Sequence, residues 1–461
     1  MSDEAVVLVW CGVSALCWTA LGSAIALKTR DGLHLGTIFC LLFAVSYPIK
    51  LAGTVFGFAA MNSDILGAEW QLRSLGLANV SAAFFIVPVI VGARRQQKID
   101  AFEVARRTHD SCAIVWLVAA MVLLTTSYGF AALRGIVSID AWSELREQRD
   151  QARLFSGGWA LIRDAGIFCL ITHFGGAVRR WERLDAVQRV GLVLIWGVVG
   201  YILLAVSGSK YMALLPLAIS LFVANFIRIE RHGSGIPLSR TAGWGLMAMV
   251  GIGLTGYLRG FTALADDENI ALSALIQASF AFDAPDNLSF ILSRVDNWWT
   301  GDLEFVPTLQ YMFLGPFPRI LWPDKPLVMG NLYIMQHYLS ERLTDELGEV
   351  INPSMAGEML VSGGHGFVIV WSLLLGIECM LVSRWAQRHR DSRIGLATQV
   401  WLSLNVFNLL RSGTGVVAPL VTFVVISSLV LAGSWLSITI SRGAVVRERR
   451  LATNGEGPHF C

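Results

Sequence analysis

Long apolar runs recur along most of the chain, and they limit the fold more than any other feature of the sequence. A helix of about 20 apolar residues crosses a hydrocarbon core of about 30 Å, so each run of that length predicts one membrane-spanning helix. About eleven such helices are expected. They fall near residues 5–27, 33–58, 74–93, 111–133, 157–178, 190–206, 211–227, 242–260, 354–383, 395–411 and 414–440.

The composition agrees with this interpretation. The chain is 54% hydrophobic and 15% charged, whereas soluble domains carry about 25% charged residues. We therefore expect one all-α, polytopic transmembrane domain over residues 1–461, with membrane lipid as its solvent. The net charge of +2 gives no indication of nucleic-acid binding. The seven cysteines include no CxxC pair, so neither a disulfide framework nor a zinc site is predicted.

The basic residues of the short connections predict the orientation. Cytoplasmic loops are enriched in Lys and Arg, and alternate connections of this chain are basic, as is its tail. An odd number of helices then places the C-terminus in the cytoplasm and the N-terminus, with Asp3 and Glu4, outside. The residues that carry this pattern include Lys28, Arg30, Arg94, Arg95, Arg179, Arg180, Arg228, Arg231, Arg384, Arg388, Arg447 and Arg449.

The segment 261–353 is then a large extracytoplasmic loop. At about ninety residues it is much longer than ordinary connections, and long loops without low-complexity composition are usually functional. Its aromatic residues among charges predict interfacial helices along the outer leaflet. Arg319 and Lys325 lie among prolines that impose a stiff path. Two cations on a rigid loop suit a diphosphate; the alternative is a structural turn.

Three more cations are expected at the outer boundary of the membrane. Arg259 ends the predicted helix 242–260, while Lys210 and Arg411 lie in very short outward turns. Topology alone favours their convergence on one outward-facing site, and snorkelling to the interface is the alternative for Arg259 and Lys210.

Two further groups are candidates for a general base. Glu358 lies in the first turns of the predicted helix 354–383, where stabilisation by the helix dipole is the alternative interpretation. His365, seven residues later, is expected on roughly the same face, but its Gly363-Gly364-His365-Gly366 context favours helix packing. His337 is a second candidate base, from the long loop. Lys50 is interpreted as a packing residue.

Four landmarks in order resemble the Wzy-type polymerases of O-antigen and related bacterial polysaccharides. They are Ser207-Gly208-Ser209-Lys210, Arg259-Gly260-Phe261, Pro318-Arg319 through Trp322-Pro323-Asp324-Lys325-Pro326, and Gly357-Glu358.

The resemblance implies a GT-C-like fold in the bacterial cytoplasmic membrane and an inverting, metal-independent glycosyl transfer at its outer face. A glycan on polyprenyl diphosphate would be moved onto a lipid-linked repeat unit, without a cofactor, alongside a flippase and a chain-length regulator as partners. Glu358, or else His337, would act as the base, and cations would stabilise the diphosphate. These cations are Arg259, Arg319, Lys325, Lys210 and Arg411.

Three alternatives stay open from the sequence. An O-antigen ligase uses the same donor but another acceptor, and the Trp-Pro-Asp-Lys-Pro segment favours the polymerase over it. A flippase for lipid-linked oligosaccharides, or another secondary transporter, is also polytopic, although such proteins usually have repeated halves and broken helices. The third alternative is a non-enzymatic scaffold.

Overall fold

The computed structural model describes residues 3–55, 67–93, 116–124, 156–179, 181, 184–207, 210–245, 284–294, 354–389 and 393–411. All regular structure in these residues is helical, as the sequence predicts. The elements are α1 (Asp3–Thr29), α2 (Leu35–Ala44), the π-helical turn η1 (Val45–Ile49), α3 (Lys50–Val55), α4 (Ala68–Gly92), α8 (Ser156–Arg179), α9 (Ala186–Ser207), α10 (Lys210–His232), α13 (Ala284–Arg294), α17 (Ser354–Arg388) and α18 (Arg393–Arg411), with shorter helices at 116–124 and 238–245.

Within the described ranges, four helical segments are long and apolar enough to cross a membrane: Asp3–Thr29, Leu35–Gly53, Ala68–Gly92 and Gly363–Arg388. Large apolar side chains also lie on their outer surfaces, among them Trp10, Leu16 and Val91. In α8, which contains Arg163 and Asp164, only Ala165–Val178 forms an apolar stretch. The predicted span 414–440, and most of 111–133 and 242–260, lie outside the described residues. The total of eleven spans and the GT-C-like fold are therefore still predictions.

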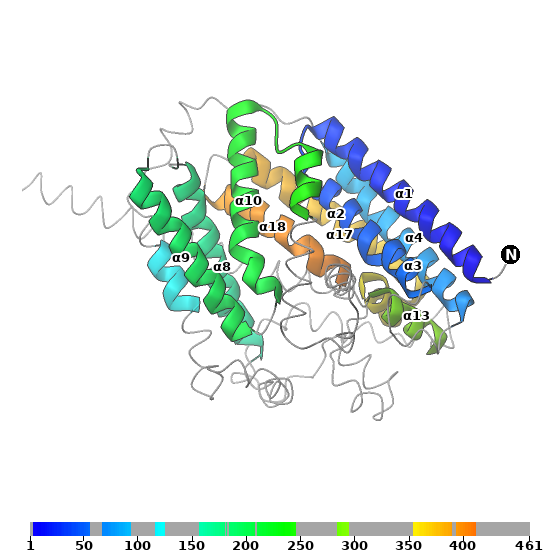
Figure 1. The fold of residues 1–461 in the computed structure, drawn as a ribbon. Helices are drawn as coiled ribbons and strands as arrows, with labels where there is room; N and C mark the ends of the chain where they lie inside the picture. Colours follow the sequence, from blue (N-terminus) through cyan, green and yellow to red (C-terminus); the bar gives the residue numbers. More distant parts are fainter. Residues whose placement is uncertain are drawn as a thin grey trace, which may run out of the picture.

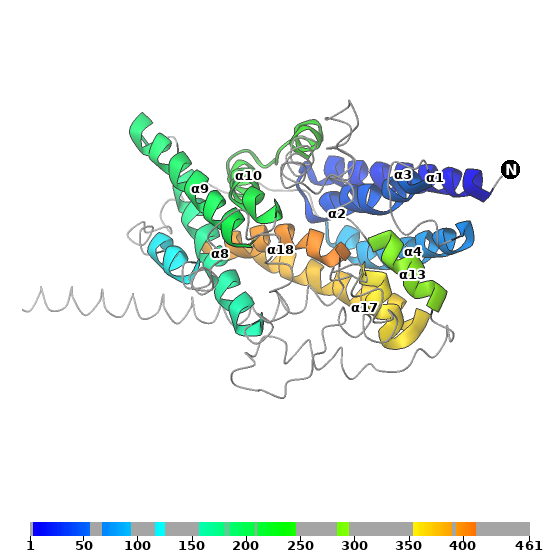
Figure 2. The same cartoon turned by 60° about the horizontal axis from the view of Figure 1, so that its bottom comes forward.

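The helices form two groups joined by α18 (Figures 1 and 2). One group contains α1 to α4, α13 and α17, and the other contains α8, α9, α10 and the helix at 116–124. Each group encloses its own cluster of buried apolar side chains. Residues of α18 belong to both clusters: Leu396 and Val400 to the second, and Val406 and Leu409 to the first. This helix therefore connects the two halves of the bundle.

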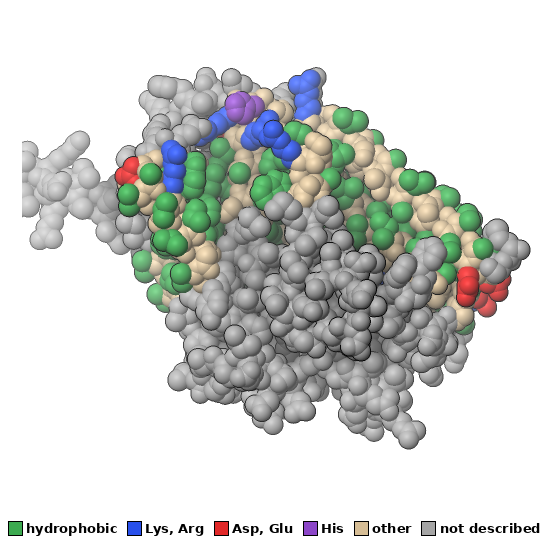
Figure 3. Space-filling model, in the orientation of Figure 1, with side chains coloured by type: hydrophobic (Ala, Val, Ile, Leu, Met, Phe, Trp, Pro, Cys, Tyr) green, Lys and Arg blue, Asp and Glu red, His purple; other side chains and the backbone are tan. Residues whose placement is uncertain are grey.

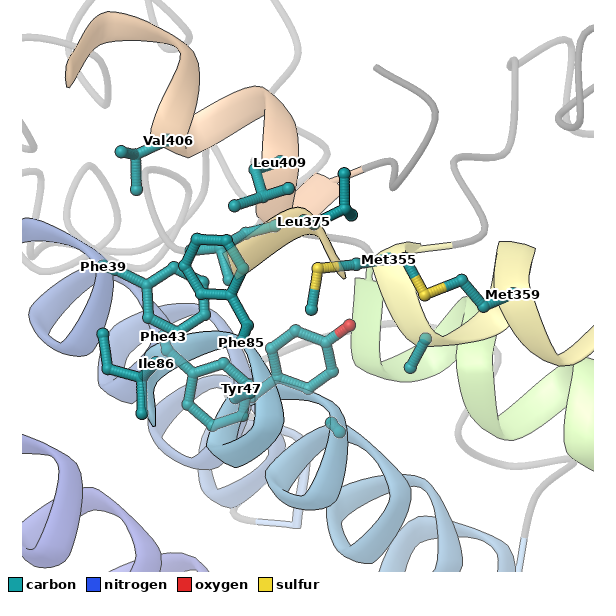
Figure 4. Close-up of a cluster of buried hydrophobic side chains, with 14 of the residues drawn as sticks. Phe39, Phe43, Tyr47, Phe85, Ile86, Met355, Met359, Leu375, Val406 and Leu409 are labelled. Atoms are coloured by element: carbon teal, nitrogen blue, oxygen red, sulfur yellow. The ribbon is translucent and has the colours of Figure 1, made fainter. Parts of the chain in front are cut away.

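Aromatic rings fill the core of the first group (Figure 4). The rings of Phe39 in α2 and Phe85 in α4 have centroids 4.4 Å apart. Phe43 continues the row and stacks on Tyr47 with a centroid distance of 4.9 Å and an interplanar angle of 13°. Tyr47 belongs to η1, where Pro48 lies inside the helix and has no backbone N–H to donate. The π-helical turn is the local accommodation of that proline.

Basic side chains gather at one end of the bundle, which is called the basic end below. Lys28 lies in the last turn of α1, and Arg231 and His232 lie in the last turn of α10. Arg388 lies in the last turn of α17. Figure 3 shows Lys and Arg side chains along the upper edge, where α1 and α10 end, and acidic side chains beside the start of α1. The starts of α4 and α17 lie at the opposite end.

Two connections are hydrogen-bonded to each other at the basic end, and this arrangement is called the lock below. The Gly32 N–H donates to the Ile236 carbonyl and the Gly235 N–H donates to the Arg30 carbonyl, both at 2.8 Å. The buried Asp31 carboxylate accepts from the Leu33 N–H at 2.9 Å and from the Asn225 amide at 3.0 Å. These bonds fix the connection between α1 and α2 against the residues that follow α10.

Candidate functional site

Glu358 is the one predicted site residue whose side chain is among those described, and it is buried inside the protein. Its exposed fraction is 1%, and its neighbours Met355, Met359 and Leu360 are also buried. A carboxylate that faced lipid would be costly. The start of α17 is instead enclosed by α4 and α13, so Glu358 lies in a protein interior at the end opposite the basic end.

Ser354 sets the beginning of α17. Its side chain is fully buried, and its hydroxyl accepts a hydrogen bond from the Gly357 N–H at 3.1 Å. This bond satisfies one of the backbone donors that a helix leaves free in its first turn. The backbone of Ser354 has φ of 68°, in the left-handed region that residues other than glycine rarely adopt. The residue that precedes Glu358 by one turn is therefore strained and needs support from its surroundings.

Tyr47 lies beside the start of α17. It is buried and belongs to the same apolar cluster as Met355. In Figure 4 its hydroxyl points away from the phenylalanine rings and toward the start of α17, beside Met355. This packing joins η1 to α17 across more than three hundred residues of sequence.

Lys50, for which the sequence favours a packing role, is also a functional candidate. It begins α3, one turn after Tyr47, and only 2% of it is exposed. Tyr47 shares a buried cluster with Met355 and Met359, which lie on either side of Glu358 in the sequence. A buried ammonium is costly in a membrane unless it has partners. The burial of Lys50 therefore makes this residue a functional candidate. The signal available in the sequence was a lone lysine within an apolar run.

Helix α13 covers the same region and is the described part of the long segment 261–353. The Ser289 hydroxyl donates to Ser74 of α4 at 2.8 Å. A Cβ at Gly357 would lie 3.0 Å from Ile291 and 3.4 Å from Leu288, so α13 packs closely beside Glu358. The segment predicted to carry chemistry therefore does contact the start of α17.

A break divides α17 a short distance after Glu358. Gly363 and Gly364 have non-helical backbone angles, with φ of 71° at Gly364. His365 and Glu358 lie on different halves of an interrupted helix, so the regular helical spacing behind their expected shared face does not hold between them. Glycine accepts such angles without the steric cost of a Cβ, which is why the break occurs there.

The remaining predicted site residues are described in part or not at all. Lys210 is the first residue of α10 and Arg411 the last of α18, so their backbones lie at the same end of the bundle as Glu358. Leu409 and Leu410, just before Arg411, share a buried cluster with Met355 and Met359. The α10 helix packs instead with α8, α9 and α18, in the other group. Arg259, Arg319, Lys325 and His337 lie outside the described residues.

In the part of the chain that the structure describes, no three His, Cys, Asp or Glu side chains are grouped as a metal site requires. Glu358, Lys50, Tyr47 and Ser354 are buried polar side chains near one end of an apolar bundle, and they are called the polar layer below. No family model matches the chain, and no solved structure matches it.

Proposed function

We propose that this chain is a polysaccharide repeat-unit polymerase of the bacterial cytoplasmic membrane. It transfers a glycan from polyprenyl diphosphate to a lipid-linked repeat unit at the outer face, by an inverting reaction without a metal. The basic end of the bundle faces the cytoplasm under this proposal, because basic connections are retained there. The N-terminus and the layer of Glu358 then face outward.

The observation that carries the proposal is the enclosure of Glu358. Glu358 is buried in the first turns of α17, the helix that follows the long segment 261–353, and α13 of that segment packs against the adjacent Gly357. A base must lie within hydrogen-bond reach of the hydroxyl that it deprotonates. A carboxylate set beneath a long outward segment, at the outer end of the bundle, has the location that this role requires.

The carboxylate and the cations have separate roles in the proposed reaction. Glu358 takes the proton of the acceptor hydroxyl as that oxygen attacks the anomeric carbon, and the bond from this carbon to the diphosphate breaks with inversion. Arg259, Arg319, Lys325, Lys210 and Arg411 stabilise the negative charge that develops on the diphosphate. The diphosphate is a good leaving group, so no general acid is needed. His337 is the alternative base.

A transporter of lipid-linked oligosaccharides is the second candidate, and a specific observation favours it. Discontinuous helices and buried charges are characteristic of secondary transporters. Here α17 is interrupted at Gly363 and Gly364, and Lys50 is buried within an apparent span. The polar layer lies toward one end of the bundle, however, whereas transporter sites lie near the bilayer midplane.

The discriminating experiment uses the purified full-length protein in nanodiscs with lipid-linked repeat units from cells that lack this chain. A polymerase yields a ladder of longer glycans, and Arg319→Ala and Arg259→Ala lose the ladder while the variants stay folded. Full-length ladders from both variants would remove these residues from the site. Movement of repeat units across liposomes without chain growth would replace the enzyme with a transporter, and transfer only to an added lipid A core would indicate a ligase.

A further inference from the structure

We infer that the lock at the basic end builds a binding surface for the headgroups of anionic phospholipids. This headgroup surface consists of Lys28, Arg30, Arg240 and Trp244, and its partner is the membrane leaflet at the basic end. The inference goes beyond the proposed function, because it requires a chain that lies in a membrane and not a chain that transfers glycans.

The lock brings the cations together from two connections that are distant in the sequence. The Gly235 N–H donates to the Arg30 carbonyl at 2.8 Å. A Cβ at Gly32 would lie 2.6 Å from the Thr241 Oγ1, so the residues that follow α10 pack directly against the connection between α1 and α2. The backbone of Arg240, the residue before Thr241, therefore lies beside the connection that carries Arg30.

The exposed charge of this surface is positive. On the two joined connections and the last turn of α1, the exposed charged side chains are Lys28, Arg30 and Arg240. No carboxylate among the described residues forms an ion pair with any of them. Asp31 is 2% exposed, and its carboxylate accepts from the Asn225 amide inside the protein. The cations are therefore available to an external anion, and Figure 3 shows basic side chains along this edge.

The surface lies at the level of lipid headgroups. Helix α1 has 27 residues and is long and apolar enough to cross a membrane. At about 1.5 Å per residue it is about 40 Å long, which matches a bilayer together with its headgroup regions. Lys28, in the last turn of this helix, is then placed where lipid phosphates lie.

The short helix at 238–245 adds an aromatic group beside a cation. The Arg240 and Thr241 N–H groups both donate to the Pro237 carbonyl at 3.0 Å, where this helix begins. Trp244 is 41% exposed and follows Arg240 by four residues, so the two side chains share one helix face. Guanidinium binds phosphate oxygens bidentately, and tryptophan is enriched at membrane interfaces. This pairing favours a lipid headgroup over a soluble anion.

Native mass spectrometry of the purified full-length protein in neutral detergent measures the binding. The protein is titrated with phosphatidylglycerol and, separately, with zwitterionic phosphatidylcholine, and wild type should bind phosphatidylglycerol more tightly. Lys28→Gln, Arg30→Asn and Arg240→Gln should each weaken phosphatidylglycerol binding about fivefold, the effect of one cation near an anionic surface. Phosphatidylcholine binding should not change.

These variants should stay folded. The Arg30 backbone has φ of 56°, which asparagine tolerates. Arg30 contributes to the lock through its carbonyl, which the substitution keeps. The Lys28 and Arg240 side chains are exposed, so their replacement leaves the packing intact. Thermal unfolding checks that the three variants match wild type.

Two further variants separate the arrangement of the cations from their number. Arg388→Gln is the matched control, because Arg388 is exposed in the last turn of α17 at the same end but lies outside the two joined connections. It should leave phosphatidylglycerol binding nearly unchanged. Gly235→Ala keeps every charge, but its Cβ would overlap the Asp31 carboxylate and separate the connections. It should weaken phosphatidylglycerol binding.

Three results would overturn the inference. Unweakened binding in all three charge variants would remove the surface, and equal weakening by Arg388→Gln would mean that binding follows only the total charge of this end. Release of phosphatidylglycerol by millimolar inorganic phosphate would indicate a site for soluble anions instead. None of these measurements uses glycosyl transfer. A wild-type protein that extends no glycan would therefore end the proposed function and leave the headgroup surface standing.

Discussion

Gly376 of α17 lies directly against the backbone of Phe85 of α4. A Cβ at position 376 would stand closer to the Phe85 carbonyl oxygen than real side-chain carbons ever approach a backbone atom. The two helices run parallel here, with the Ser81 and Ser372 hydroxyls hydrogen-bonded at 2.8 Å and Gly92 facing Met380 nearer the basic end. Close approach at small residues is the usual basis of helix association in membranes, where no hydrophobic force drives the helices together.

Gly376→Ala should therefore destabilise the bundle. The obstacle is backbone, which cannot move aside as a flexible side chain can, so the helices must separate at a cost of about 1–3 kcal/mol. Thermal unfolding in detergent would measure the loss. Gly76→Ala is the matched control, because nothing lies within 4 Å of a Cβ at that position of α4. Equal stability of the two variants would contradict the close packing of α4 and α17.

The lock at the basic end predicts two opposing effects of pH. Burial raises the pKa of Asp31 to about 6, against the lowering effects of its hydrogen bonds with Asn225 and Leu33. Burial and the nearby Lys28 charge lower the pKa of His34 to about 4. The Asp31 contribution to stability is full below its unfolded pKa of 3.8 and is lost as pH rises to about 6. The His34 contribution is present above 6.5 and is lost as pH falls to about 4.

These opposing effects cancel in part, so single variants should reveal them. In Asp31→Asn the stability should rise with pH between about 4 and 6.5, owing to His34. In His34→Asn the stability should fall as pH rises over about 4 to 6, owing to Asp31. Asparagine keeps an acceptor for the Gly36 N–H, which donates to His34 Nδ1 at 3.2 Å. Unfolding curves at several pH values test both slopes, and a flat profile in both variants would contradict the burial of the two groups.

Gly235→Ala should open the lock by a steric route. A Cβ at this position would overlap the Asp31 carboxylate and stand 2.7 Å from the Asn225 side-chain oxygen. These two groups already hydrogen-bond each other, so the clash should cost about 1–3 kcal/mol. Thermal unfolding beside Gly243→Ala, where a Cβ has open space, measures the difference. A Gly235→Ala variant as stable as its control would show that the connections are not locked.

Asn79 predicts a smaller effect in the middle of the first group of helices. Its side-chain oxygen accepts from the Ser14 hydroxyl at 2.9 Å and from the Trp18 indole N–H at 2.6 Å. Asn79→Leu should cost about 1 kcal/mol, the usual order for hydrogen bonds between membrane helices. Ser23→Ala, which removes an exposed hydroxyl bonded only within α1, is the control and should change stability little. A loss no larger than that of the control would mean that Asn79 does not hold α1 and α4 together.

The sequence predicted the helices well where apolar length decides them. The expected ranges 5–27, 157–178 and 395–411 lie within α1, α8 and α18. The start of α4 was placed too late, at 74 instead of Ala68, because the first turn carries the exposed pair Glu69 and Arg73. A criterion of apolar length does not detect such a turn, although residues four apart with opposite charge favour a helix.

The candidate site was predictable only in its separate parts. Glu358 stood out because a carboxylate at the start of an apolar helix is unusual. The packing of Tyr47 beside Met355 was not predictable, since it joins distant segments and no local pattern specifies that pairing. The break at Gly363 and Gly364 had a signal in its glycines, but glycine also serves close packing, and only the backbone angles distinguish the two uses.

The most direct test of the account is chain growth by Glu358→Gln beside Glu69→Gln. Both carboxylates lie near the start of a helix at the same end of the bundle, but Glu69 is exposed and paired with Arg73, whereas Glu358 is buried. With the lipid-linked repeat unit as substrate, wild type and Glu69→Gln should both give a full glycan ladder. Glu358→Gln should remain folded and give none. A normal ladder from Glu358→Gln would contradict the assignment of this residue as the base of a glycosyltransferase.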